Sequence, residues 1–173
     1  EAGENAKHLI GKVVSAVGGG MYAQYRVLPA MACIEMPDDI EPKDCASSFV
    51  NPLTALGMVE TMKSEGHSAL IHTAAASNLG QMLVKICLAD NIPLINIVRK
   101  PEQVDLLKSL GAEYVCNSSD DNFKDSLVEA IKATNATLAF DATGGGELSG
   151  RILSCMEIAM RTNMKEFSPY GST

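Results

Sequence analysis

A run of small residues after an apolar segment has the composition of an anion-binding turn. Residues 74–80 read Ala-Ala-Ala-Ser-Asn-Leu-Gly. Small side chains at Ala74 and Ser77 would let a phosphate approach the backbone, and the first turn of a following helix would offer it N–H groups. Gly80 would allow that helix to pack closely on the preceding strand. Of the dinucleotide-binding pattern G-x-G-x-x-G only the last glycine is present. An ordinary tight turn, with Ser77 or Asn78 capping the helix, is therefore the alternative.

Two basic residues stand where the second strand of such a unit would meet the ribose of adenosine. Arg99 and Lys100 lie about 20 residues beyond Gly80, the spacing at which NAD enzymes place an acidic residue for the ribose hydroxyl. Arginine binds phosphate through two parallel hydrogen bonds. The pair therefore favours a 2′-phosphorylated cofactor, NADP rather than NAD. The alternative is a solvated basic pair beside Glu102.

Both features need a strand–helix–strand framework, and the chain supplies one. We expect strands at about 68–74, 93–99, 113–117 and 137–142, with helices between them and after the last. The first two are nearly continuous apolar runs, typical of parallel strands covered on both faces. Alternating strands and helices predict the fold class α/β, a doubly wound, Rossmann-like parallel sheet. Such a sheet has six strands when complete, so four indicate a truncated sheet and a piece of a longer protein.

Apolar residues at helical spacing predict how the helices face this sheet. One helix is expected over 52–64 and should end at Gly66; the apolar residues on or near one of its faces are Leu53, Leu56, Val59 and Met62. Pro101 should begin another helix, which Gly111 should end. Two further core stripes are Phe123, Leu127 and Ile131, and Leu148, Ile152 and Met156.

The first 50 residues have a different, strand-rich pattern. Short strands are expected at 12–17, 22–27 and 31–36. Glu41-Pro42-Lys43-Asp44 should open a short helix, because proline and acidic residues suit a first helical turn. We therefore expect one domain over 1–50 and a second over 51–173.

Composition and charge exclude several classes of function. Lys and Arg number 14 and Asp and Glu number 21, a net charge of −7 that should repel nucleic acid and anionic membranes. Apolar runs such as 93–98 are too short to span a bilayer. The five cysteines are scattered, without a C-x-x-C pair or a histidine-rich cluster. They predict neither a disulfide framework nor a metal site, and suit reduced, buried thiols in a cytoplasmic protein. His72, in an apolar strand, is expected to be a core histidine with its hydrogen bonds satisfied.

Five short motifs occur together in one order along the chain. They are Gly-Met-Tyr-Ala-Gln-Tyr at 20–25, Asn-Pro-Leu-Thr-Ala at 51–55, Ala-x-x-Ser-x-x-Gly at 74–80, Leu-x-x-Leu-Gly-Ala at 107–112, and Phe-Asp-Ala-Thr-Gly-Gly at 140–145. With these the sequence resembles, over essentially its whole length, the quinone oxidoreductase-like, zinc-independent branch of the medium-chain dehydrogenase/reductase superfamily. That family usually has glycine where Ser77 and Asn78 stand.

The resemblance implies a domain assignment and a set of cofactor-binding residues. Residues 1–50 would be the end of a GroES-like catalytic domain, and 51–173 a dinucleotide-binding domain without its last strands. The residues implied to bind NADP are Asn51 and Thr54 near the nicotinamide; Ala76, Ser77, Asn78 and Leu79 at the pyrophosphate; Arg99, Lys100 and Asn117 on the adenosine side; and Thr143 and Gly144 in the crevice loop.

Simpler structural roles compete with several of these assignments. Asn51 could instead cap the helix that Pro52 begins, and Asn117 could be an ordinary turn residue. Asp141 is expected to be a structural hydrogen-bond acceptor rather than a base.

The leading functional hypothesis is NADPH-dependent hydride transfer to a small molecule, a quinone or an α,β-unsaturated carbonyl. No catalytic residue can be named, and the piece alone should not turn over. One alternative is a non-catalytic NADPH-binding module or redox sensor. Another is a methyltransferase, which Arg99 and Lys100 disfavour, since that fold expects an acidic residue there. A homo-oligomer is expected from the resemblance and from the open edge of the strand at 137–142.

Overall fold

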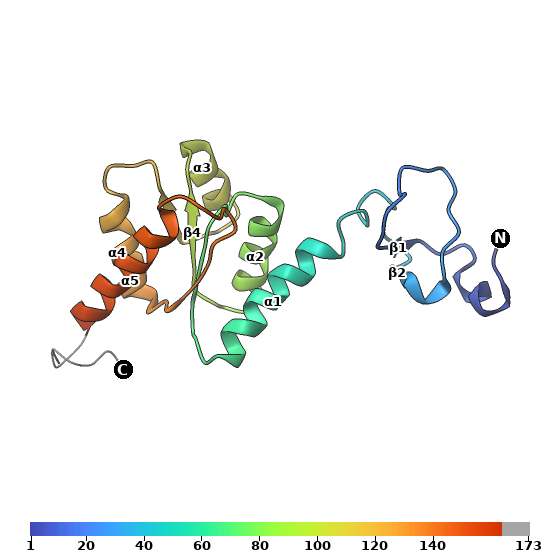
Figure 1. Ribbon diagram of the computed structural model, residues 1–173, viewed down its shortest axis with the longest axis horizontal. Helices are drawn as coiled ribbons and strands as arrows, with labels where there is room; N and C mark the ends of the chain where they lie inside the picture. The colour runs from blue at the N-terminus through green and yellow to red at the C-terminus, as the bar shows by residue number, and fades with distance from the viewer. Residues whose placement is uncertain (164–173) are drawn as a thin grey trace. The chain divides into compact units, whose positions relative to one another are not determined.

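The computed structural model describes residues 1–163 of the chain (Figure 1). Two compact units divide between Pro52 and Leu53. The first is small and irregular, and the second contains the parallel sheet and its helices.

The first unit is built on a two-stranded antiparallel ladder. Strands β1 (Val14–Ala16) and β2 (Cys33–Glu35) pair with Ser15 opposite Ile34, as two of the predicted strands require. Two short 3₁₀ helices, η1 (Glu4–Leu9) and η2 (Ala30–Ala32), complete it. Within residues 1–52 Cys45 alone is buried.

Two predictions for the first unit are wrong. No strand forms at 22–27, where Tyr22, Tyr25 and Val27 are almost fully exposed. An alternating pattern makes a strand only when a neighbouring strand and a core take up its apolar face, and this segment has neither. The helix expected from Glu41 is replaced by successive turns over 42–47, because isolated turns of so few residues do not repay helix nucleation.

The second unit confirms the predicted doubly wound α/β fold. Its sheet has the order β5-β4-β3-β6, and every neighbouring pair is parallel. The strands are β3 (Leu70–His72), β4 (Leu94–Val98), β5 (Tyr114–Asn117) and β6 (Leu138–Phe140). Leu70 is in register with Leu94 on one side and with Leu138 on the other. Among residues 1–163, β6 pairs with no strand on its outer edge.

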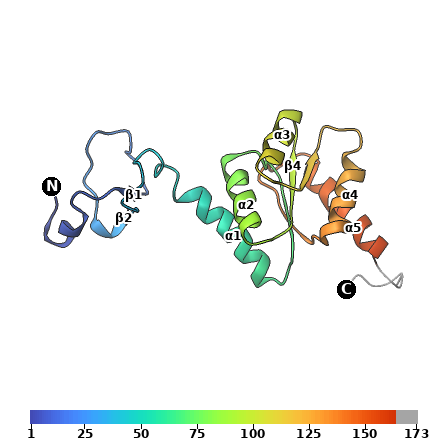
Figure 2. The same cartoon turned by 180° about the vertical axis from the view of Figure 1, so that it is seen from behind.

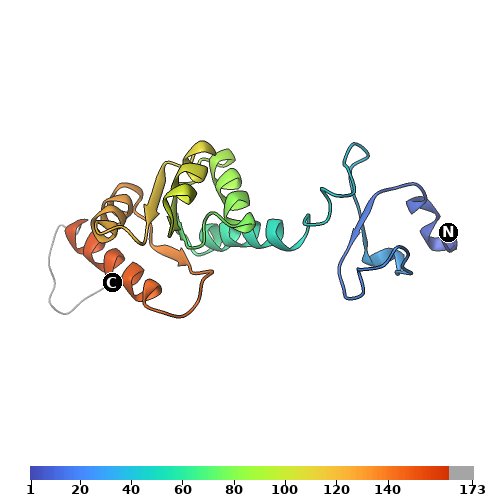
Figure 3. The same ribbon diagram turned by 90° about the horizontal axis from the view of Figure 1, so that it is seen from above.

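Five helices cover both faces of the sheet (Figures 2 and 3). They are α1 (Val50–Ser64), α2 (Asn78–Ala89), α3 (Pro101–Ser109), α4 (Phe123–Thr134) and α5 (Leu148–Asn163). Alternate strand residues face opposite layers. Leu70, Leu94 and Val98 belong to the core with α1, α2 and α3, whereas Ile71, Ile95 and Ile97 belong to the core with α4 and α5. This two-sided burial explains why the strands are largely apolar, with His72, Asn96 and Asn117 as their buried polar residues.

The helix boundaries follow the expected signals. Pro101 is the first residue of α3, and Gly66 and Gly111 follow α1 and α3 with φ of +78° and +96°. The predicted apolar face of α1 is only half right. Its buried residues are Ala55, Val59 and Met62, while Leu53 and Leu56 are exposed. Ala55 replaces them because the face that meets the sheet follows spacings of four and three from Val59.

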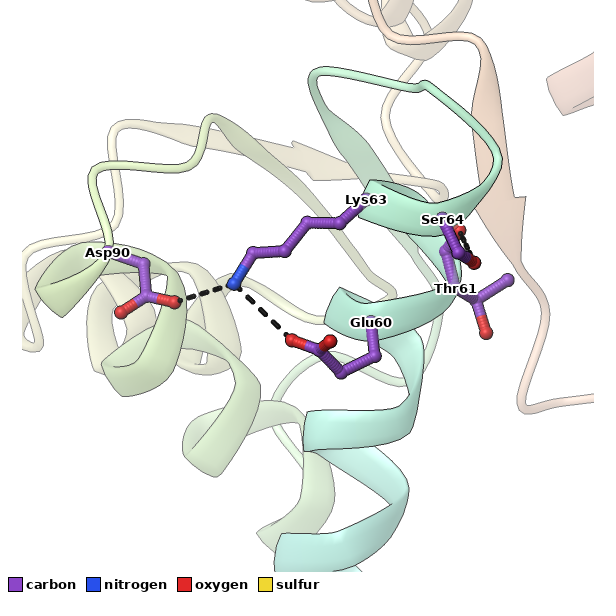
Figure 4. A network of polar contacts seen from close by, with 5 residues as sticks. All are labelled: Glu60, Thr61, Lys63, Ser64 and Asp90. Carbon is purple, nitrogen blue, oxygen red and sulfur yellow. Dashed lines mark hydrogen bonds and ion pairs between the residues drawn. The ribbon is translucent and has the colours of Figure 1, made fainter.

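A polar contact joins the ends of α1 and α2 (Figure 4). Lys63 Nζ lies 3.4 Å from both Glu60 Oε1 and Asp90 Oδ2. All three side chains are well exposed, so this pair of contacts contributes little to stability. Burial of Val59 and Met62 therefore accounts for most of the docking of α1.

Candidate functional site

A cavity of about 700 Å³ lies at the carboxyl ends of the strands in the second unit. Its walls come from the β3–α2 turn, the end of β4 and the β6–α5 loop. The chain winds outward from β3 through β4 to β5 and then returns to β6 on the other side of β3. In open α/β sheets the crevice at such a reversal is the usual ligand site.

The β3–α2 turn brings the backbone close to this cavity. Ala74, with φ of +50°, and Ala76 line it, and so does Ser77, the N-cap of α2. The Ser77 hydroxyl accepts a hydrogen bond of 3.2 Å from the backbone N–H of Gly80. The capping role considered for Ser77 is therefore present in the structure.

Gly80 is required by the packing of α2 against this turn. A Cβ at Gly80 would lie 2.1 Å from the carbonyl oxygen of Ala75, far inside van der Waals contact. The obstructing atoms are backbone and cannot move aside. The predicted close approach of helix and strand at this glycine is confirmed.

Arg99, directly after β4, is one of the residues that line the cavity. Its backbone N–H donates to Gln103 Oε1 at 3.2 Å, and its carbonyl accepts from Ser119 Oγ at 2.9 Å. Within residues 1–163 its guanidinium makes no ion pair. Lys100 differs: it is the N-cap of α3, is not among the lining residues, and lies 3.7 Å from Glu102 Oε1. The two cations therefore have different surroundings.

Asp141 organises the β6–α5 loop that forms the opposite wall. Its Oδ1 accepts from the Thr143 hydroxyl at 2.6 Å, the Thr73 hydroxyl at 2.7 Å and the Thr143 N–H at 3.0 Å. The Ala142 N–H in turn donates to Thr73 Oγ1 at 2.8 Å. The donors, with Thr143 first, lower the pKa of Asp141 to about 2. Such a carboxylate is a poor base near neutral pH, and the predicted role as a structural acceptor is confirmed.

Asp141→Ala is expected to weaken binding of any ligand of this cavity by about tenfold, because the three hydrogen bonds that the Asp141 carboxylate accepts, and that hold the loop, are lost. The loss of affinity should be equal for NADPH and NADH. The hydrogen bonds of Asp141 do not involve Arg99, the residue assigned to the phosphate that distinguishes the two cofactors. Titration calorimetry measures both affinities. Asp121→Ala, at an exposed residue outside this network, is the control and should change neither. A variant that bound one cofactor normally and lost only the other would contradict this role.

The β6–α5 loop also contributes three glycines to the cavity, and two further lining residues from other elements were not singled out by the sequence. Gly144, Gly145 and Gly146 all have positive φ, between +63° and +71°. Side chains are strained in this conformation, so glycine keeps the wall both thin and unstrained. Gln103 and Ser118 also line the cavity. Gln103 is the third residue of α3, where a glutamine often bonds back to the backbone before the helix, and this spacing could have revealed it.

The structure brings together only part of the predicted set. Of the predicted residues, those lining the cavity are Ala76, Ser77, Arg99, Thr143 and Gly144. Asn78 and Leu79 are the first residues of α2 and lie just outside the lining. Asn117 is buried, and its side chain donates to Asp120 Oδ1 at 2.7 Å and accepts from the Ser119 N–H at 3.1 Å, so it shapes its own turn.

The two predicted residues of α1 lie elsewhere. Asn51 lines a separate hollow of about 340 Å³ in the first unit, together with Val17 and Phe49. Helix α1 begins at Val50, so Asn51 lies inside the helix and the capping alternative is wrong. Thr54 is exposed in the same helix.

His72 is buried as predicted, but the prediction that its hydrogen bonds are satisfied is wrong. Neither ring nitrogen has a partner among residues 1–163. Burial, the larger influence, lowers the pKa of His72 to about 4, although the nearby Asp141 opposes the shift. The imidazole is therefore neutral near pH 7.

Residues 1–163 contain the cysteine thiols, and they also show whether a metal-binding group or a membrane-spanning helix is present in that range. All five cysteines are free, and burial raises the pKa of Cys87 to about 12 and of Cys116 to about 11. Residues 1–163 contain no group of three or more histidine, cysteine or acidic side chains placed to hold a metal ion. No helix in that range is long and apolar enough to cross a membrane.

Comparisons with known proteins find relatives of the chain. Residues 79–162 match the zinc-binding dehydrogenase family model. The chain is 32% identical over 108 residues to human mitochondrial enoyl-[acyl-carrier-protein] reductase, covering 60% of this chain and 29% of that protein. It is 27% identical over 141 residues to 2-haloacrylate reductase of a Burkholderia species, covering 79% of this chain and 42% of that one.

A solved structure agrees with these matches. The crystal structure of a protein from Mesorhizobium loti, described as a putative NADPH:quinone reductase, superposes with a TM-score of 0.76 at 36% identity and covers 88% of this chain and 45% of that one. The chain thus spans less than half the length of each of these relatives. Together these matches support assignment of the chain to a zinc-independent branch of the medium-chain dehydrogenase/reductase superfamily.

Proposed function

We propose that the protein is an NADPH-dependent oxidoreductase that transfers a hydride to a quinone or an α,β-unsaturated carbonyl compound. The observation that carries the proposal is Arg99, which lines the crevice at the reversal point of the sheet and makes no ion pair within residues 1–163. The names of the relatives point the same way, since they are an enoyl-thioester reductase, a haloacrylate reductase and a quinone reductase.

The residues of the cavity fit a dinucleotide. Ala74, Ala76 and Ser77 leave room beside the backbone, and Gly80 lets α2 begin close to the sheet. The first N–H groups of a helix have no partner within it. Because Ser77 takes the N–H of Gly80, the amides of Asn78 and Leu79 are the ones we assign to the pyrophosphate.

The adenosine end and the reacting end are assigned to different walls. Arg99 would bind the 2′-phosphate through its guanidinium, with Lys100 and Asn117 further out. Thr143 and Gly144, fixed through Asp141, would shape the wall next to the dinucleotide. Bound NADPH would supply the hydride, and the chain's contribution is binding, orientation and exclusion of water. We further propose that Asn51 and Thr54 orient the nicotinamide carboxamide, and that residues 1–50 belong to a GroES-like catalytic domain.

The β3–α2 turn supports an alternative, a non-catalytic NADPH-binding module or redox sensor. Ser77 and Asn78 replace family glycines, and the Ser77 hydroxyl occupies a helix N–H that a phosphate could otherwise use. A protein with such a turn could bind NADPH as a sensor without reducing anything. Within residues 1–163 β6 has no partner strand on its outer edge, which also suits pairing with a second copy in a homo-oligomer.

The proposal is tested by following NADPH consumption by the intact gene product with a quinone and with an enone. We expect oxidation of NADPH with one of these acceptors and little oxidation of NADH at the same concentration. Tight NADPH binding without turnover on any acceptor would instead support the sensor. Thermal stabilisation by S-adenosylmethionine and not by NADPH would support a methyltransferase and overturn the proposal.

A further inference from the structure

A second, smaller cavity lies between helix α2 and the amino ends of strands β4 and β5. Its volume is about 70 Å³, and it shares no lining residue with the crevice at the carboxyl ends of the strands. Most of its lining is apolar and comes from Val84, Leu88, Ile92, Pro93, Leu94 and Ala112. This cavity is therefore separate from the site proposed for the dinucleotide.

Asn96, in the middle of β4, is the buried polar residue of this smaller cavity. Its Nδ2 donates to the Leu94 carbonyl at 3.2 Å and to the Tyr114 carbonyl at 3.1 Å, so both amide donors are used. Its Oδ1 has no hydrogen-bond partner among residues 1–163, although Asn96 is only 1% exposed. Native proteins usually supply a donor to a buried acceptor of this kind. The cavity leaves room for such a donor beside Asn96.

His72 shows that burial alone does not distinguish Asn96. The two residues are in register in neighbouring parallel strands, so their side chains leave the sheet on the same face. His72 is also buried and lacks a partner within residues 1–163, but it is not among the residues that line the smaller cavity. Of the two side chains, only that of Asn96 adjoins space for a ligand.

The lining restricts the ligand of this cavity to a small neutral molecule. An apolar cavity of roughly 150 Å³ can hold benzene, so a volume of about 70 Å³ admits only a few non-hydrogen atoms. An ion would lose its hydration against the apolar wall, because the charged residue of the lining, Glu113, is exposed. Cys87 is a neutral thiol and a weak hydrogen-bond partner, since burial raises its pKa to about 12. The group that Asn96 Oδ1 requires is a hydroxyl.

We propose that this cavity binds a small hydroxyl compound, either water or an alcohol of about two or three carbons, whose O–H donates to Asn96 Oδ1. Water and the alcohol offer the same donor, and the alcohol adds an alkyl chain that the apolar lining would cover. The proposal does not depend on the use of NADPH, because the two cavities have no lining residue in common.

The test for an alcohol is a titration of the intact gene product with ethanol, followed through the NMR signals of the Val84 and Leu88 methyl groups. An alcohol site predicts shifts that saturate, with a Kd on the order of 1 mM at the tightest, since ethanol has few atoms. Ala112→Val fills part of the cavity and should weaken this binding at least about tenfold. Ala139→Val is the matched control, because Ala139 is also half-buried but packs against the other core, and it should leave the Kd unchanged.

The test for water is a crystal structure of the same protein without ethanol. A water site predicts electron density within hydrogen-bond distance of Asn96 Oδ1 together with methyl shifts that never saturate with ethanol. Val84→Ile fills the cavity from α2 and serves if Ala112→Val does not fold. A saturable ethanol response that the cavity-filling variant leaves unchanged would overturn the proposal. The absence of both a saturable response and density beside Asn96 Oδ1 would also overturn it.

Discussion

Arg99→Glu is expected to raise the Kd for NADPH about 100-fold, because it removes the charge-assisted hydrogen bonds to the 2′-phosphate and places a carboxylate against that phosphate. NADH should bind about as well as before or slightly better, because a glutamate at this position can accept from the ribose hydroxyl, as in NAD enzymes. Titration calorimetry with each cofactor gives both constants. The affinity for NADPH should also fall with added salt in the wild type and less so in the variant.

Lys100→Glu is the natural control, since it makes the same change of charge one residue away. Lys100 is outside the cavity lining and faces Glu102, so we expect its replacement to raise the Kd for NADPH by only about threefold through long-range charge. If both variants raised the Kd for NADPH equally, the affinity would depend on the total positive charge of residues 99 and 100 rather than on the position of Arg99. If Arg99→Glu weakened both cofactors equally, the assignment of the adenosine phosphate to Arg99 would be wrong.

His72 should make stability depend on pH in a defined window. The folded state disfavours the charged form of His72, whose pKa falls from 6.5 in the unfolded chain to about 4. The free energy of unfolding is therefore highest above pH 6.5 and decreases as the pH falls towards about 4. A difference of this size corresponds to about 3 kcal/mol. Asp141 does not contribute here, because its pKa lies between about 2 folded and 3.8 unfolded, and its stabilising effect is lost only below that window. Urea unfolding at pH 7 and at successively lower pH measures the slope.

Two substitutions separate this effect from general acid sensitivity. His72→Leu removes two buried nitrogens that have no hydrogen-bond partner within residues 1–163, and it should stabilise the protein at pH 7 by about 1 kcal/mol while removing the slope between pH 6.5 and 4. His67→Leu should instead destabilise by about 1 kcal/mol, because His67 Nδ1 bonds the Thr137 hydroxyl at 2.7 Å. A His72→Leu variant with the same pH slope as the wild type would show that another group titrates.

The sequence predicted the second unit well because its pattern and its tertiary contacts agree. Apart from His72 and Asn96, strands 70–72 and 94–98 are apolar because both faces of the sheet are covered. Pro101 and Gly111 mark the two ends of α3 through their own backbone conformations, which do not depend on neighbouring segments. Prediction failed where the outcome depended on burial by other segments. Tyr22 to Val27 alternates like a strand but meets no sheet, and Leu53 and Leu56 look like core residues but lie on the exposed side of α1.

The sequence predicted the parts of the site that residue type and spacing along the chain determine. The small-residue turn and Arg99 were found from spacing, and both line the cavity. The difference between Arg99 and Lys100 could not be predicted, because it depends on which residue ends the strand and which one caps α3. Ser118 and Ser119 come from the end of β5, and only the sheet order β5-β4 brings them beside Arg99. The unpaired nitrogens of His72 likewise depend on the atoms around it.

Titration of the intact, unmodified gene product with NADPH and with NADH tests most directly whether the crevice beside Arg99 recognises a phosphorylated ribose. We predict saturable binding of NADPH at least about tenfold tighter than binding of NADH, the least that one good phosphate contact provides. Equal affinity for the two, or tighter binding of NADH, would contradict the account.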